Sequence, residues 1–132
     1  MGKINSRAKG ARGEREWAKV CREHGYADVR RTVQYCGKTG DASDCVGLPG
    51  IHQEVKRTNC LQIYNAMDQA IRDAGKSGNI PIVCHRRDNC RWLVIMTAED
   101  WFKLYREFEL NREGEEDQVQ IQKLREGAAG KA

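Results

Sequence analysis

The stretch that most constrains the fold of this chain covers residues 40–56 and reads GDASDCVGLPGIHQEVK. Its centre, residues 48–50, has the sequence LPG, in which proline presets φ and glycine accepts a positive φ, so a turn is expected there. Residues 42–47 and 51–57 on either side are predicted to be the two strands of a hairpin. Asp44 lies on the first strand, and Glu54 and Lys56 lie on the second. Because ionised groups are costly to bury in a core strand, this hairpin is a candidate for function as well as for structure.

The register of this hairpin decides whether its charges meet. Glu54 and Lys56 are two residues apart on a strand, so they point to the same face while Val55 points to the other. A two-residue turn would set Asp44 opposite Val55, whereas a three-residue loop sets Asp44 opposite Glu54. We expect the three-residue loop, or a bulge with the same effect, because that register brings two carboxylates and one ammonium group together.

The hydrophobic pattern predicts the other elements. Helices are expected over about residues 10–24 and 60–75 and again from residue 98, and further strands over 26–35, 80–85 and 91–96. The order α-β-β-β-α-β-β-α predicts an α/β fold, in which a mixed central sheet of about five strands is flanked by helices. Residues 10–111 are expected to form one domain between a basic flexible arm, residues 1–9, and an acidic and polar C-terminal tail, residues 112–132.

Each predicted helix has an apolar side. In the second helix, Asn59 is the expected N-cap, and the expected core residues are Ile63, Met67, Ala70, Ile71 and Ala74. The third helix is expected to be capped by Thr97. Its apolar side holds Trp101, Tyr105 and Phe108, which are candidates for a dimer surface or for the core.

The first predicted helix places one acid on its apolar side. Glu14, Trp17, Ala18 and Cys21 follow the spacing i, i+3, i+4, i+7 and therefore share a face. Glu16 lies about 200° around the helix from Glu14 and is expected on the solvent side. Glu14 is thus the candidate functional acid, with a purely structural salt bridge as the alternative.

Composition narrows the classes of partner and compartment. Residues 1–31 hold nine Lys or Arg against four Asp or Glu, so the basic charge is concentrated where a polyanion could be met. No apolar run approaches the roughly 18 residues of a membrane span, and no secretory signal is expected. The six cysteines form no CxxC pair, which favours reduced thiols in a cytoplasmic protein and disfavours a zinc site.

Paired carboxylates beside an ammonium group suit phosphodiester hydrolysis. Hard oxygen ligands bind Mg²⁺ or Mn²⁺, which keep water molecules for the substrate and the nucleophile. Lys56 is placed to position or deprotonate that water, or to stabilise developing negative charge. Asp41 is a spare acid that competes with Asp44 for this role, and Asp44 is preferred because it leads directly into the predicted strand.

The segments KGARGEREW, HGYADVRR, SDCVGL and HQEVKR, in this order, resemble the PD-(D/E)xK nuclease superfamily. Within it the order is similar to the archaeal-type Holliday junction resolvases and their phage relatives, over roughly residues 9–96. The resemblance implies a restriction-endonuclease-like fold and a Mg²⁺-dependent homodimer that cuts four-way DNA junctions in a bacterial or phage-infected cell. It implies the catalytic set Glu14, Asp44, Glu54 and Lys56, with the three acids as metal ligands. Ser43 replaces the proline of the superfamily name, and the loop before Asp44 is long.

DNA contacts are expected from basic residues near this set. The resemblance assigns phosphate contacts to Arg15 and Arg30, and the further candidates are Lys9, Arg12, Arg31, Arg57, Arg86 and Arg87. Gln69 is expected at the surface, although some related nucleases use a glutamine here to steer water or phosphate. Two other functions stay open: another nuclease of the superfamily, restriction-like or acting in replication and repair, and a non-catalytic DNA-binding module of the same fold.

Overall fold

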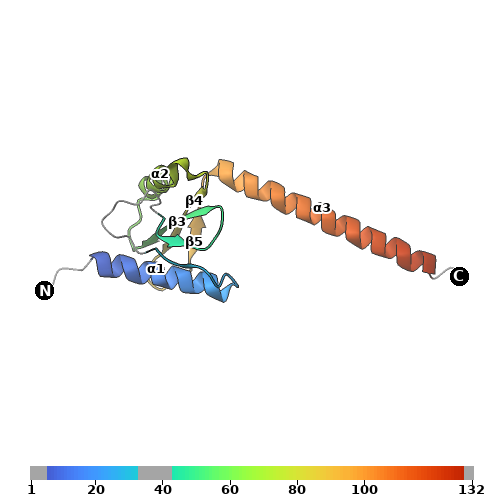
Figure 1. Ribbon diagram of the computed structural model, residues 1–132, viewed down its shortest axis with the longest axis horizontal. Helices are drawn as coiled ribbons and strands as arrows, with labels where there is room; N and C mark the ends of the chain where they lie inside the picture. Colours follow the sequence, from blue (N-terminus) through green and yellow to red (C-terminus); the bar gives the residue numbers. More distant parts are fainter. Residues whose placement is uncertain (1–5, 33–42, 130–132) are drawn as a thin grey trace. The chain divides into compact units, whose positions relative to one another are not determined.

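The computed structural model describes residues 6–32 and 43–129, and its elements follow the predicted order (Figure 1). The helices and strands are α1 (Ser6–Glu23), β1 (Arg30–Arg31), β2 (Cys45–Val46), β3 (Ile51–Arg57), α2 (Ile63–Ala74), the 3-10 turn η1 (Gly75–Ser77), β4 (Ile80–Arg86), β5 (Leu93–Ile95) and α3 (Ala98–Ala129). The five strands form one sheet in the order β1-β2-β3-β4-β5. Strands β3 and β4 are parallel and all other neighbours are antiparallel. The predicted α/β fold with a mixed five-stranded sheet is therefore confirmed.

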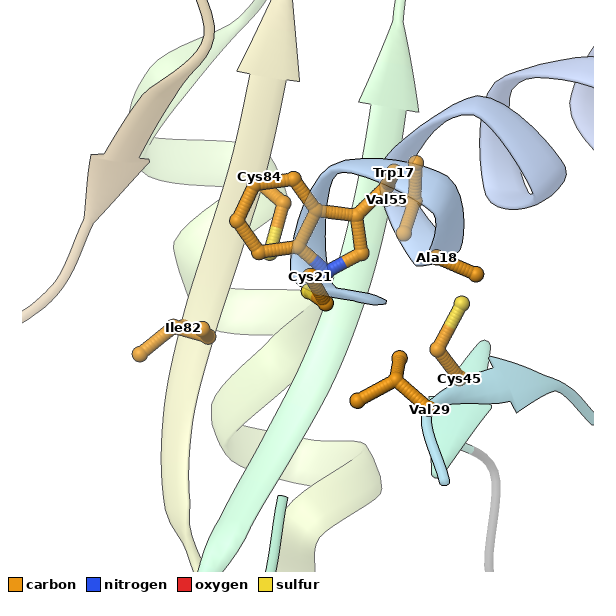
Figure 2. Close-up of a cluster of buried hydrophobic side chains, with 8 residues drawn as sticks. All are labelled: Trp17, Ala18, Cys21, Val29, Cys45, Val55, Ile82 and Cys84. Carbon is orange, nitrogen blue, oxygen red and sulfur yellow. The ribbon is translucent and has the colours of Figure 1, made fainter. Parts of the chain in front are cut away.

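Strand β3 is the centre of the sheet and is covered on both faces. On one face, α1 packs against the sheet in a cluster of eight buried side chains shown in Figure 2: Trp17, Ala18, Cys21, Val29, Cys45, Val55, Ile82 and Cys84. On the other face, Ala66, Met67 and Ala70 of α2 pack against Val83. Side chains alternate along a strand, so residues 53 and 55 of β3 face α1 while residues 52, 54 and 56 face α2.

The hairpin has the predicted register. Cys45 pairs with Gln53, which sets Asp44 opposite Glu54 and leaves residues 48–50 as a three-residue loop. The backbone N–H of Ile51 donates to the Leu48 carbonyl oxygen at 3.0 Å and closes that loop. Prediction and structure agree because the turn composition and the alternation of side chains leave one register in which the charged face is shared.

The boundaries of α1, β1 and α2 differ from the sequence prediction. Helix α1 begins at Ser6, so residues 6–9 belong to the helix and not to an arm, in line with the good helix formers that they contain. Strand β1 is two residues long: residues 26–29 and 32 of the predicted strand 26–35 are not strand, and residues 33–35 lie outside the described residues. Helix α2 begins after Gln62, not after Asn59, because the Asn59 side chain is bonded instead to Asp88 in the turn after β4.

The buried side of α2 is also displaced from the prediction. Ala66, Met67, Ala70 and Ala74 are buried, while Ile63 and Ile71 are 51% and 44% exposed. Alanines face the sheet because their small side chains let the helix approach it closely, and the larger isoleucines are left on the outer flank. Met67, Ala70 and Ala74 confirm the prediction, and the two isoleucines do not, because hydrophobicity alone ranks Ile above Ala.

Residues 98–132 form a unit of their own, and within it α3 is an unbroken helix to Ala129. The sequence predicts a polar tail from residue 112, but residues 112–129 continue the helix. The segment from residue 112 is rich in Glu and Gln, which favour helix. Arg112–Glu116 and Gln122–Glu126 are bonded one turn apart. Trp101, 48% exposed, stacks on Tyr105 with ring centroids 5.2 Å apart, so neither belongs to a core.

Candidate active site

The candidate site lies on the α2 face of the sheet, where two adjacent strands present their charges. Asp44 precedes β2 and lies opposite Glu54 of β3. Lys56 is two residues further along β3 and shares the Glu54 face. These three of the four predicted catalytic residues are therefore brought together by the sheet itself, without a long loop.

The Asp44 and Glu54 carboxylates are each fixed by a donor from the chain. Asp44 Oδ2 accepts the backbone N–H of Val55 at 2.8 Å. Glu54, only 2% exposed, has its Oε1 3.1 Å from Nε2 of the buried His52. Burial and the facing Glu54 carboxylate raise the pKa of Asp44 to about 7, and the Val55 N–H opposes this rise. The Asp44 and Glu54 carboxylates thus repel each other when both are ionised, and the Lys56 charge offsets only part of this repulsion.

Lys56 is held in place by a residue of α2. Its Nζ donates to Gln69 Oε1 at 2.8 Å, and both side chains are partly buried. Gln69 was expected at the surface, but it lies on the flank of α2 that turns toward β3, where the amide orients the ammonium group. The ammonium keeps two further N–H donors for other partners.

Glu14 lies near this group but is engaged elsewhere. Its Oε2 accepts from Nε of Arg31. Burial, and to a smaller extent the charge of Asp44, raises the Glu14 pKa, and the bond with Arg31 opposes this rise. Among residues 6–32 and 43–129, no three His, Cys, Asp or Glu side chains gather as a ready metal site. The structure therefore unites Asp44 with Glu54 and leaves Glu14 as a neighbour paired with arginine.

Glu16 does not lie among the solvent-side charges where helical phase placed it. It forms ion pairs with Arg57, at 3.4 Å, and with Arg86. Helix α1 crosses the ends of β3 and β4, so residues on two sides of the helix meet the sheet. Gly13 permits this approach, because a Cβ at that position would lie 2.6 Å from Cβ of Arg57.

Comparison with protein-family models identifies the family of this chain. A family model described as "Phage putative PDDEXK endonuclease" matches residues 5–131, nearly the whole chain. The chain belongs to this phage PDDEXK family. No match was found among curated proteins or among solved structures. The family name implies a nuclease and hence DNA as the substrate.

The predicted DNA contacts of this PDDEXK protein divide into two groups. Arg31, Arg57 and Arg86 are tied to acids of the same chain. The others are exposed side chains with no ion pair to any described residue: Lys9, Arg12, Arg15, Arg30 and Arg87. Only this second group offers charge that is not already neutralised. Asp41 lies outside the described residues.

Two supporting residues were missed by sequence reasoning. His52 is bonded to Glu54, and its position two residues before Glu54 on one strand face was the available signal. For Gln69 the resemblance was the available signal, because its contact with Lys56 spans separate elements. The part of the chain that the structure describes contains no helix long and apolar enough to cross a membrane.

Proposed function

We propose that this protein is a Mg²⁺-dependent DNA endonuclease that cuts four-way junctions as a homodimer, with Mn²⁺ able to substitute. The observation that carries the nuclease proposal is the placement of Asp44 opposite Glu54 with Lys56 on the same face. The catalytic residues proposed are Asp44, Glu54 and Lys56, and Glu14 is proposed as an accessory acid. Its place of action would be the cytoplasm of a bacterial or phage-infected cell.

The residues present fit a divalent cation. Asp44 and Glu54 are hard oxygen donors on facing strands, and Mg²⁺ is usually bound by one or two carboxylates while it keeps several waters. One oxygen of each carboxylate is fixed, by Val55 N–H and by His52, which orients the groups as outer partners of ligands do. A cation held there would neutralise charge on the scissile phosphate and lower the pKa of a bound water.

Lys56 acts next to that pair. With one N–H donated to Gln69, its two remaining donors can bond a phosphate oxygen and the attacking water. A fixed ammonium group stabilises the charge that develops on the phosphate without reorganising as the reaction proceeds. Because Gln69 accepts the third N–H of Lys56 and contacts no reacting atom in this proposal, it is a positioning residue for Lys56.

Glu14 enters as a third acid only when it separates from Arg31. The two side chains are paired in the structure, and Arg31 is 32% exposed, so DNA phosphate can compete for the guanidinium. A strand bound at Arg31 would release the Glu14 carboxylate toward Asp44, whose charge already acts on it. This exchange would link substrate binding to completion of the acidic set.

The choice of four-way junctions rests on the order of motifs, which resembles the Holliday junction resolvases. Two symmetric cuts need two sites, and one chain supplies one, so a C2 dimer meets the requirement. The catalytic residues alone would cut any phosphodiester presented to them. The rivals are therefore a nuclease of the same superfamily with another DNA substrate and a DNA-binding module without activity.

A cleavage assay separates these readings. Four-way junction, flap, linear duplex and single strand are incubated with the protein and Mg²⁺, Mn²⁺ or EDTA, and the mass of the protein is measured with and without junction. Paired symmetric cuts in the junction alone, by a dimer, support the proposal. Equal cutting of linear duplex would remove the junction preference, and no cutting with either metal would favour the binding module.

Lys56→Ala is the matched variant for this assay. It should reduce cleavage by at least about 100-fold, since a charge-stabilising donor at the reacting phosphate is lost, while junction binding in EDTA stays within a few-fold. Lys76→Ala, which removes an exposed lysine from η1, is the control and should cleave normally. Normal cleavage by Lys56→Ala would place the active site elsewhere.

A further inference from the structure

The turn between β4 and β5 holds a surface pocket of about 470 Å³. We name it the tip pocket, and its lining residues are His85, Arg87, Asn89, Cys90, Arg91 and Leu93. The lining includes two arginines and no acid. This composition is that of a site for an anion.

The tip pocket adjoins the candidate active site through the sheet. Lys56 of β3 pairs with His85 of β4, and His85 in turn pairs with Leu93 of β5. Paired residues on neighbouring strands point to the same face and lie about 5 Å apart. One row of side chains therefore runs from Lys56 to the pocket, on the face that also carries Glu54.

The only acid in this turn is engaged away from the pocket lining. Asp88 accepts from Asn59 Nδ2 at 2.9 Å and pairs with Arg57 Nη1 at 2.8 Å. The hydrogen bond from Asn59, and then that from Arg57, hold the pKa of Asp88 below its usual range. The Asp88 carboxylate is therefore charged and already has its hydrogen-bond partners. Arg87 and Arg91 are exposed and form no ion pair with any residue in the ranges that the structure describes.

The turn is also held in one shape. Asn59 both donates to Asp88 and accepts the Asp88 backbone N–H at 2.8 Å, which ties the turn to the end of β3. Arg86 Nε donates to the Cys90 carbonyl oxygen at 2.6 Å, and Cys90 N–H donates to the Arg87 carbonyl oxygen. Asn89 adopts φ 59°, a conformation that asparagine accepts more readily than most residues. Little ordering is therefore left to occur when a ligand binds.

We propose that the tip pocket binds a backbone phosphate of the DNA strand, next to the phosphate that is cut, through Arg87 and Arg91. Arginine suits this role because its planar group can bond two phosphate oxygens at once. The pocket would hold the strand in register with Lys56 and would carry no base readout. The inference rests on the proposed nuclease function for its substrate, and its test is a binding measurement in which nothing is cut.

The test compares Arg87→Ala/Arg91→Ala with the unchanged protein, using a fluorescein-labelled four-way junction and a linear duplex in EDTA. The double variant should bind roughly 10- to 100-fold more weakly at 100 mM salt. The slope of log K against log[salt] should fall by about 1 to 2, as one or two phosphate contacts are lost. With Mg²⁺ and saturating DNA, kcat should stay within about twofold while KM rises.

Two further variants guard the interpretation. Arg87→Lys/Arg91→Lys keeps the charge and should recover most of the affinity lost by the alanine variant. Arg106→Ala/Arg125→Ala removes two exposed arginines from α3 and should change affinity by less than about threefold. Thermal unfolding of each variant checks that the fold is kept.

Binding within twofold of the unchanged protein, with the same salt slope, would overturn the proposal, as would a loss of kcat without a change of Kd. An equal loss for the α3 control would also overturn it, because net charge would then explain the effect. If no DNA is cut with Mg²⁺ or Mn²⁺, the nuclease proposal fails on its own, and the EDTA binding data still decide the tip pocket.

Discussion

At the scale of single residues, Asp44 and Glu54 are like charges that face each other at the edge of a core. Glu54 is 2% exposed, and Asp44 is partly buried with a pKa raised to about 7. A raised carboxyl pKa means that the folded state favours the protonated form. Its favourable contribution is complete below the unfolded value of 3.8 and is lost as pH rises through about 7.

Asp44→Asn should therefore stabilise the protein in EDTA at alkaline pH, by at most about 4 kcal/mol at pH 8.5 from a shift of roughly three units. At about pH 3, below the unfolded pKa, the variant and the unchanged protein should unfold at similar temperatures. Thermal unfolding followed from about pH 3 to pH 9 measures this. Parallel pH curves for the two proteins would contradict the assignment of the charge conflict to Asp44.

Gln69 is the second residue whose role follows from one contact. Gln69→Ala removes the acceptor that orients Lys56 Nζ, so kcat should fall roughly 10-fold, which corresponds to about 1.4 kcal/mol, the worth of a hydrogen bond to a charged group. KM and DNA binding in EDTA should be unchanged, which a general loss of structure would not produce. Asn65→Ala, at an exposed position of α2, is the control. An unchanged kcat for Gln69→Ala would show that Lys56 needs no such support.

At the scale of elements, the hairpin turn depends on Gly47. Its φ is 110°, and a Cβ would lie 2.5 Å from the Asp28 carbonyl oxygen, so both conformation and space exclude a side chain. Gly50 has φ 85° but open space around the position of a Cβ. A substitution at Gly50 therefore tests backbone strain alone, whereas one at Gly47 tests strain together with a steric clash.

Gly50→Ala should cost about 1 to 3 kcal/mol through strain alone. Gly47→Ala should cost more, because the chain before β1 must also move away from the turn that sets Asp44 opposite Glu54. Urea unfolding of both variants gives the two free energies of unfolding. Equal losses in the free energy of unfolding would mean that the backbone at Asp28 moves away from the new Cβ at little cost.

The element order and the hairpin register were predictable because they depend on local signals. Alternation, helical periodicity and the turn LPG are all read within about ten residues. Asn59 shows the limit of such signals: it has the chemistry of a helix cap, but its partner is Asp88, 29 residues away. Gln69 with Lys56 and Glu16 with Arg86 are likewise long-range pairs. Their geometry follows from helix placement on the sheet, which the local pattern does not contain.

At the scale of the whole molecule, charge and core are unevenly shared between the two units. Residues 98–132 hold nine Asp or Glu against six Lys or Arg, although the whole chain has a net charge of +4. Every buried residue of the two core clusters lies between Trp17 and Cys84, within the first unit. The second unit therefore adds acidic charge and exposed aromatic rings and contributes no member to either cluster.

A chain of residues 1–97 should thus unfold within about 0.5 kcal/mol of the full chain, since no core side chain is removed. Its affinity for linear duplex DNA at low salt should be equal or higher, because the net charge of the remaining part is more positive. Urea unfolding and fluorescence anisotropy in EDTA measure the two quantities. A large loss of stability would show that α3 supports the sheet.

Strand β3 serves as a common wall for two compartments, since one side is lined by the α1 core and the other carries Glu54 and Lys56. Laboratory evolution of this protein would be affected because β3 contributes to both the core and the candidate site. A selection for heat tolerance alone would enrich amide replacements at Asp44, because they relieve the repulsion between the facing acids, and those survivors would have lost a proposed ligand. Substitutions that raise thermal stability should therefore be chosen away from β3 and Asp44, or selected together with cleavage activity.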